Sequence, residues 1–153
     1  MTPKVAINII LVLFVAILGV VGYKLAPQRH IGTGAKLPVV ACNPALTDCS
    51  VALPNGGGIE LSFSPRPIRP LQAFKARLTI RDREVRSAEI DFEGTDMKMG
   101  YYRPPFNRAD VALVADAILP VCVTGTMQWE ATVLLNAPTG QIAIPFHFEV
   151  AGR

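Results

Sequence analysis

Apolar and polar residues alternate one by one in several short runs after residue 42. The clearest runs cover residues 59–63, 74–81, 88–93, 127–135 and 142–150, and turn residues such as Pro, Gly, Asn and Asp separate them. A period of two places every second side chain on the same face of a β-strand, so each run indicates a strand with one buried face. About seven such strands in a domain of this length predict an all-β fold, an immunoglobulin-like β-sandwich.

The pattern also predicts which strands pair. If the runs at 74–80 and 88–94 form a hairpin, apolar residues meet on one face and opposite charges meet on the other, as cross-strand energetics favour. Lys75 then faces Glu93, and the neighbouring Arg77 also faces an acidic residue. This interpretation explains the basic side chains of the first strand as a solvated face without any ligand.

A second hairpin is expected around Thr124–Thr126, where glycine occupies the middle of a short loop. This hairpin places Val121 opposite Trp129. Trp129 belongs to the inward set of the run at 127–135, so the sequence predicts that it lies at the centre of the sandwich core.

The N-terminal run from Val5 to Tyr23 holds no charge and one polar side chain, Asn8. Nineteen helical residues, at roughly 1.5 Å of rise each, span about 28 Å, which matches the hydrocarbon core of a bilayer. The run therefore predicts an uncleaved transmembrane anchor. A cleaved signal peptide and a lipoprotein signal, with Cys42 as its cysteine, remain alternatives.

Two of the three cysteines are separated by six residues rich in turn formers. Cys42 and Cys49 enclose Asn-Pro-Ala-Leu-Thr-Asp, a loop that a disulfide closes easily. A disulfide indicates an oxidising compartment. We therefore expect a single-pass protein of the bacterial inner membrane with a cytoplasmic N-terminus, an anchor at 1–24, a tether at 25–41 and a periplasmic β-sandwich domain at 42–153. The alternative is that all three cysteines are reduced and buried.

Charge and motifs exclude several classes of function. The basic residues before residue 42 have no acidic counterpart, but the remaining 112 residues carry 11 basic and 12 acidic side chains. A near-neutral domain lacks the basic face that nucleic-acid binding needs. The chain contains no G-x-S-x-G, C-x-x-C or H-E-x-x-H pattern, so we expect no enzyme and no catalytic residue.

One segment that breaks the alternation suggests a metal. Met97 and Met99 point to the same face if their segment is extended, and soft thioethers and thiolates suit Cu(I). Pairing of the other two cysteines leaves Cys122 as a third soft ligand, with His147 as a harder candidate. The alternative is that the methionines fill gaps in the core and that His147 pairs with Glu130.

The stretches Asp96–Gly100 and Leu119–Gly125, followed by Trp129, resemble small membrane-anchored periplasmic proteins of bacteria. The layout of one N-terminal helix and one immunoglobulin-like domain is similar to the FixH and YtkA-like group. This resemblance implies a role in copper handling and in the assembly of respiratory haem–copper oxidases.

The leading interpretation is a non-enzymatic accessory protein that binds a membrane-protein partner and needs no cofactor. The chain lacks the His-rich and Met-rich motifs of periplasmic copper carriers, so a Cu(I)-binding protein is the alternative.

Overall fold

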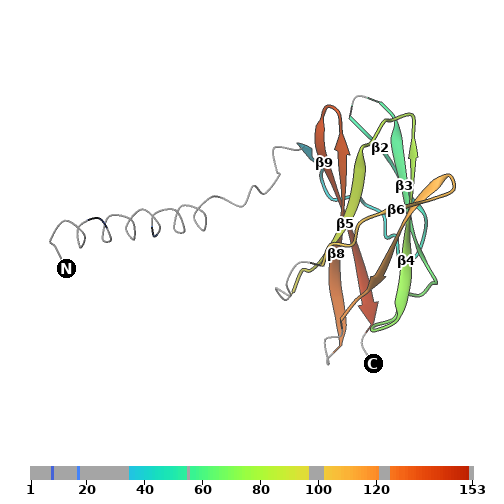
Figure 1. Ribbon diagram of the computed structural model, residues 1–153. Coiled ribbons are helices and arrows are strands. Elements are labelled where there is room, and N and C mark those ends of the chain that lie inside the picture. The colour runs from blue at the N-terminus through green and yellow to red at the C-terminus, as the bar shows by residue number, and fades with distance from the viewer. Residues whose placement is uncertain are drawn as a thin grey trace. The chain divides into compact units, whose positions relative to one another are not determined.

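The computed structural model describes Asn8, Ile17 and residues 35–54, 56–96, 102–120 and 125–151. The chain divides into two units, Met1–Gly32 and Thr33–Arg153. The larger unit is an all-β sandwich (Figure 1). Its strands are β1 (Ala35–Lys36), β2 (Cys49–Ala52), β3 (Gly58–Ser64), β4 (Ala73–Arg81), β5 (Ser87–Gly94), β6 (Asn107–Ala109), β7 (Ala112–Ile118), β8 (Thr126–Ala137) and β9 (Gly140–Ala151).

The predicted anchor at 5–23 lies outside the described residues except at Asn8 and Ile17, and both of these have helical backbone. In the part of the chain that is described, no helix has the length and apolar character needed to cross a membrane.

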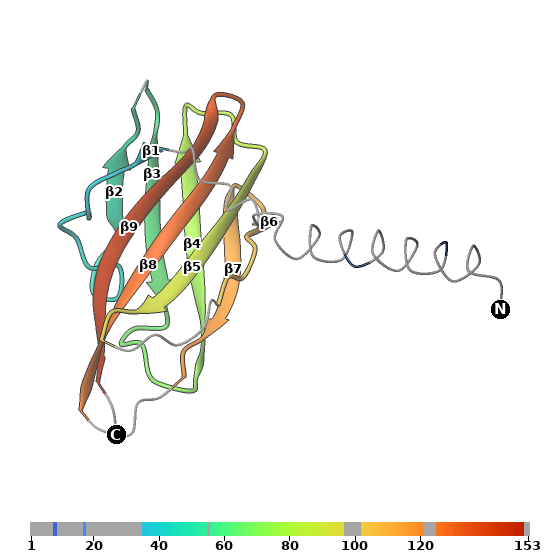
Figure 2. The same cartoon turned by 90° about the vertical axis from the view of Figure 1, so that its left-hand side faces the viewer.

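Two sheets form the layers of the sandwich. Sheet A has the strand order β1-β9-β8-β5, and sheet B has the order β2-β3-β4-β7-β6. Figure 2 looks onto sheet A, with sheet B behind it. All neighbours are antiparallel except β1 and β9, which are parallel. Alternate side chains of both sheets point inward, as the period of two predicts.

The first predicted hairpin is wrong, because β4 and β5 belong to different sheets. Strand β4 pairs with β3 and β7, and β5 pairs with β8. Lys75 therefore lies opposite Asp116 of β7, and its Nζ is 2.6 Å from that carboxylate. The alternation of a strand determines which face is buried, but it does not determine which neighbour that strand takes.

The second predicted hairpin is wrong for the same reason. Strand β8 lies between β5 and β9, so the neighbours of Trp129 in the sheet are Gly94 and Phe148. The expected neighbour, Val121, lies outside the described residues. The inward orientation of Trp129 is confirmed, since its side chain is only 3% exposed.

Four buried phenylalanines occupy the centre of the core. Phe63 and Phe74 come from sheet B, and Phe92 and Phe148 come from sheet A. Their ring centroids lie 5.3 to 6.3 Å apart, mostly in edge-to-face arrangements. Such pairs stabilise a core beyond the area that they bury. The centre of the sandwich is therefore this phenylalanine cluster rather than Trp129 alone.

The chain joins sheet A earlier than residue 42. Strand β1 pairs with Ile142 and Ala143, and Val40 N–H donates to the Pro145 carbonyl at 2.9 Å. Leu37 and Val40 pack against the core. Residues 35–40 therefore lie along the edge of β9, within the range predicted as the tether.

Candidate functional site

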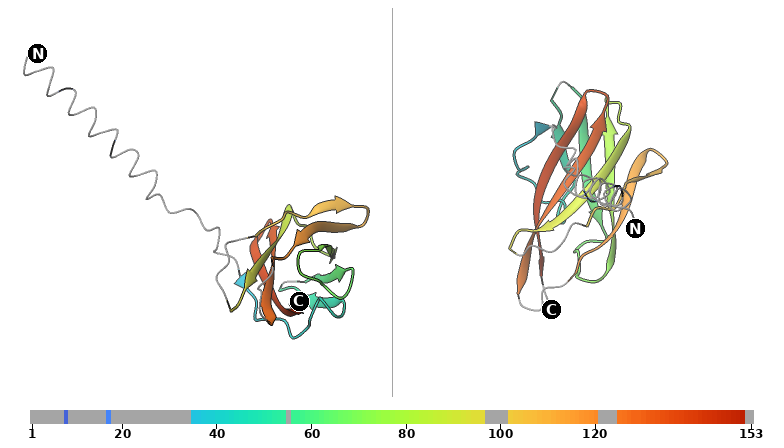
Figure 3. Two further views of the ribbon diagram at one scale, coloured as in Figure 1. Left: turned by 90° about the horizontal axis from the view of Figure 1, so that it is seen from below. Right: turned by 60° about the vertical axis from the view of Figure 1, so that its left-hand side comes forward.

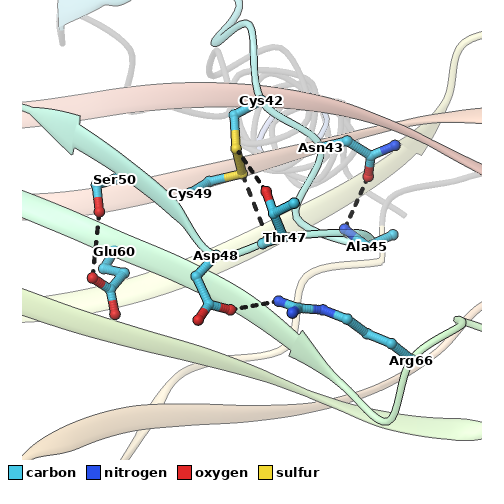
Figure 4. Close-up of a disulfide and its surroundings, with 9 residues drawn as sticks. All are labelled: Cys42, Asn43, Ala45, Thr47, Asp48, Cys49, Ser50, Glu60 and Arg66. Atoms are coloured by element: carbon cyan, nitrogen blue, oxygen red, sulfur yellow. Dashed lines mark hydrogen bonds and ion pairs between the residues drawn. A yellow bond between two sulfur atoms is a disulfide. The ribbon is translucent and has the colours of Figure 1, made fainter.

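The disulfide predicted between Cys42 and Cys49 is present, with Cα atoms 5.8 Å apart (Figure 4). Cys42 follows the segment that lies on sheet A, and Cys49 begins β2 of sheet B. The disulfide therefore closes the loop by which the chain crosses from one sheet to the other. Within this loop the Asn43 side chain accepts a hydrogen bond from the Ala45 N–H at 2.9 Å. Asp48 forms an ion pair with Arg66 at 2.6 Å.

The three sulfur atoms proposed for Cu(I) belong to Met97, Met99 and Cys122, which all lie outside the described residues. Among residues 35–54, 56–96, 102–120 and 125–151, together with Asn8 and Ile17, no three His, Cys, Asp or Glu side chains are grouped closely enough to hold a metal ion.

His147 pairs with Glu130, the predicted alternative to a role as metal ligand. Its Nε2 lies 3.0 Å from Glu130 Oε2, and Lys36 of β1 lies 3.6 Å from Oε1 of the same carboxylate. The Thr132 hydroxyl also donates to Oε1 at 3.1 Å. Burial raises the pKa of Glu130, but the hydrogen bond from His147, the charge of Lys36 and the hydrogen bond from Thr132 outweigh burial, and the net pKa is lowered. This carboxylate therefore links three neighbouring strands of sheet A.

A cleft of about 690 Å³ lies where the end of β4 and the start of β5 meet the hairpin formed by β6 and β7. Apolar side chains line the cleft together with charged ones. The lining residues are Leu78, Ile80, Arg83, Glu84, Val85, Arg86, Ser87, Ala88, Phe106, Arg108, Asp110, Val111, Ala112 and Leu113. Leu78, Ala88 and Phe106 are buried members of the core, so the cleft has an apolar floor.

Arg83 has a structural role at this cleft. Its guanidinium donates to the Pro54 carbonyl at 2.8 Å and to the Thr139 hydroxyl at 3.0 Å. These bonds connect the turn before β3 with the turn between β8 and β9. Arg83 is therefore occupied by contacts within the domain.

The other four charged side chains of the cleft are unpaired. Arg86, Arg108, Glu84 and Asp110 have no hydrogen bond or ion pair through their side chains with any described residue. Two cations and two anions thus surround an apolar floor without neutralising one another.

The β6–β7 hairpin carries an apolar side chain at its tip. Figure 3 shows this hairpin, drawn in orange, extending beyond the neighbouring strands of sheet B. Val111 is 93% exposed, and all three residues of β6 are exposed as well. An isolated exposed valine is common on protein surfaces. Here the valine lies beside an apolar cleft and at the edge of a sheet, an arrangement typical of a protein-binding site.

This cleft was not expected from the sequence, because the segments of β6 and β7 show no clear alternation. The segment of β7 reads Ala-Leu-Val-Ala-Asp-Ala-Ile, and its inward positions are partly alanine. Small apolar residues on both faces hide the period of two. The one available signal was Asp110-Val111, a turn-forming residue followed by an apolar residue between two short strands.

No protein-family model matches this sequence, and a search of curated proteins gives no match either.

Proposed function

We propose that this chain is a non-enzymatic accessory protein, anchored by one N-terminal helix in the bacterial inner membrane, whose β-sandwich domain binds other proteins in the periplasm. The uncharged run at 5–23 has the length of a membrane span. The disulfide between Cys42 and Cys49 favours an oxidising compartment for the domain.

The strand order supports the assignment of the domain as immunoglobulin-like. Strands β3-β4-β7-β6 follow the order A-B-E-D of that fold, and β9-β8-β5 follow the order G-F-C. The strands β1 and β2 are then additions at the edges. Many domains of this architecture are binding modules on cell surfaces, although a fold alone does not determine a function.

The observation that carries the proposed function is the cleft beside the β6–β7 hairpin. Its apolar floor, its unpaired charges and the exposed Val111 together provide what a protein interface requires, an apolar centre with a polar rim. The resemblance to the FixH and YtkA-like group suggests the class of partner, a subunit or assembly factor of a respiratory haem–copper oxidase complex.

The test is capture of the tagged full-length chain from crosslinked membranes, followed by identification of the proteins retained. Val111→Asp should abolish retention of a membrane-complex subunit, because it places a charge at the apolar tip. Leu46→Asp changes another exposed apolar residue, in the disulfide loop, and should leave retention intact. Equal retention by the two variants, or a wild-type chain found outside the membrane fraction, contradicts the proposal.

Binding of Cu(I) through Met97, Met99 and Cys122 is a second candidate function. It is favoured by the disulfide, which leaves Cys122 as the only one of three cysteines available as a thiolate. Titration of the protein with Cu(I) against a competing chelator tests this function. Cys122→Ser should weaken binding if the thiolate is a ligand, and Met127→Leu, at a buried methionine of β8, is the control.

A further inference from the structure

We propose that the β6–β7 hairpin joins this chain to a second copy of itself, so that the protein acts as a twofold symmetric dimer. The inference rests on the proposed function, since it names one partner of the same surface. Three features of the hairpin support it: a free sheet edge, an exposed apolar tip and charges that complement one another.

One free edge belongs to β6, which ends the order of sheet B and, among the residues that the structure describes, pairs with β7 alone. The other edge strand of sheet B, β2, holds four residues and is followed closely by the turn before β3. In sheet A, by contrast, further segments of the chain lie along β5 and β9. Residues 102–106 lie along β5, where Phe92 N–H donates to the Tyr102 carbonyl at 3.0 Å, and residues 35–40 lie along β9. An uncovered edge strand offers its backbone N–H and C=O groups to another strand. Two copies of β6 can therefore pair antiparallel about a twofold axis.

The apolar tip supplies area for burial. Val111 follows β6 by two residues and is almost fully exposed in a single chain. A second copy placed against β6 covers this side chain and removes it from water. Removal of apolar surface from water stabilises an interface.

The charges favour a second copy over a partner of uniform charge. The unpaired side chains at the cleft are two arginines and two acids, so a purely acidic or purely basic partner would pair with only half of them. If a twofold axis places one residue opposite a second residue of the other copy, it also places the second residue opposite the first, so each such contact occurs twice. If the antiparallel pair is centred on Ala109, Arg108 faces the second copy's Asp110, and Asp110 faces the second copy's Arg108.

Charge reversal tests this pairing in the full-length chain, purified in detergent and studied by sedimentation over a range of concentrations. Wild type should associate reversibly to a dimer. Arg108→Asp places acids opposite acids twice, and Asp110→Arg places bases opposite bases twice. Each variant alone should raise the dimer Kd by about tenfold or more. The matched control, Glu89→Arg on the outer face of sheet A, should dimerise like wild type.

Mixing the two variants gives the decisive result. An equal mixture of Arg108→Asp and Asp110→Arg chains restores opposite charges at both contacts, so a heterodimer should form from two chains that do not dimerise alone. Wild type that stays monomeric, or a mixture that stays monomeric, overturns the inference. Circular dichroism of each variant establishes that its β-structure is intact.

The outcomes separate this inference from the proposed function. A dimer that obeys the charge rules, with no other protein captured from membranes, supports the inference and contradicts the accessory role. A monomeric chain whose captured subunit is lost in Val111→Asp supports the accessory role and overturns the inference. Anchoring of both copies in the same membrane would raise their effective concentration. A small interface of this kind would then be sufficient for dimerisation in the membrane.

Discussion

Glu130 and His147 face each other across the β8–β9 pair, with 3.0 Å between Oε2 and Nε2. The same carboxylate contacts Lys36 of β1, so one side chain connects the first strand of the domain to the centre of sheet A. His147 is half exposed, and its Nε2 contacts a carboxylate of the same domain. The pair is a structural contact of the outer face of sheet A.

Replacing Glu130 with Gln should lower the free energy of unfolding at neutral pH by up to about 1 kcal/mol, because partly exposed ion pairs contribute little each. The pKa of Glu130 is lower in the folded protein than its usual value of 4.5. Its contribution is therefore complete above pH 4.5 and is lost as the pH falls through the folded pKa. Urea unfolding should show a smaller difference between variant and wild type at about pH 3 than at pH 7. Glu89→Gln, on the same face and without an ion-pair partner among the described residues, is the control.

The negative charge of Glu93 should destabilise the folded domain. It lies directly opposite Glu130 in the β5–β8 register, and like charges placed opposite each other weaken a sheet. Glu93→Gln should raise the free energy of unfolding by about 0.2–1 kcal/mol at low salt. The gain should shrink at high salt, where charges are screened, and should vanish in a Glu130→Gln background. An unchanged gain in that background would assign the effect to another neighbour.

Gly57 and Gly56 form a matched pair in the turn before β3. Both have positive φ, 77° and 96°, so alanine at either position should lower the free energy of unfolding by about 1–2 kcal/mol, because L-residues disfavour the left-handed conformation. A Cβ on Gly57 would also lie 2.7 Å from the Arg81 carbonyl oxygen, whereas a Cβ on Gly56 meets nothing within 4 Å. Thermal melts should show Gly57→Ala to be clearly less stable than Gly56→Ala. Equal melting temperatures would contradict this close approach of the turn to β4.

Trp129→Ala should lower the free energy of unfolding by about 3–5 kcal/mol, since the side chain is buried between the sheets and alanine leaves a cavity. Trp129→Phe keeps an aromatic ring at the position and should lose less. Chemical denaturation measures both losses. An alanine variant with the melting temperature of wild type would mean that the indole is not part of the core.

Loss of the Cys42–Cys49 disulfide should lower the free energy of unfolding by roughly 2–3 kcal/mol in the chain-entropy model. The double substitution to serine and the reduced wild type should show this loss in thermal melts with and without reductant. Cys122→Ser tests the assignment, because it should melt like wild type and respond to reductant in the same way. A Cys122→Ser protein insensitive to reductant would indicate a different pairing.

Local pattern accounts for the parts of the fold that depend on single strands. Alternation in residues 127–135 was enough to predict that Trp129 points inward, because side chains of a strand alternate faces whatever its neighbours are. The short spacing of Cys42 and Cys49 was enough to predict the disulfide, because the loop between them is rich in turn formers. The outward position of His147 on its strand made a pairing with Glu130 one of two alternatives, and the β8–β9 register brings these two residues together.

Only the tertiary structure decided which strands are neighbours. Lys75 had acidic residues available on β5 and on β7, and both pairings join opposite charges, so the sequence could not choose between them. The choice depends on burying both sheet faces at once, which requires the chain to cross from β4 in sheet B to β5 in sheet A. The same crossing creates the phenylalanine cluster, in which Phe74 of β4 meets Phe92 of β5 and Phe63 of β3 meets Phe148 of β9. It also creates the cleft, where β4 and β5 meet the β6–β7 hairpin. By itself, the sequence determined the faces of individual strands and the disulfide; the long-range packing of the two sheets decided the neighbours and the surface where we expect the protein to bind.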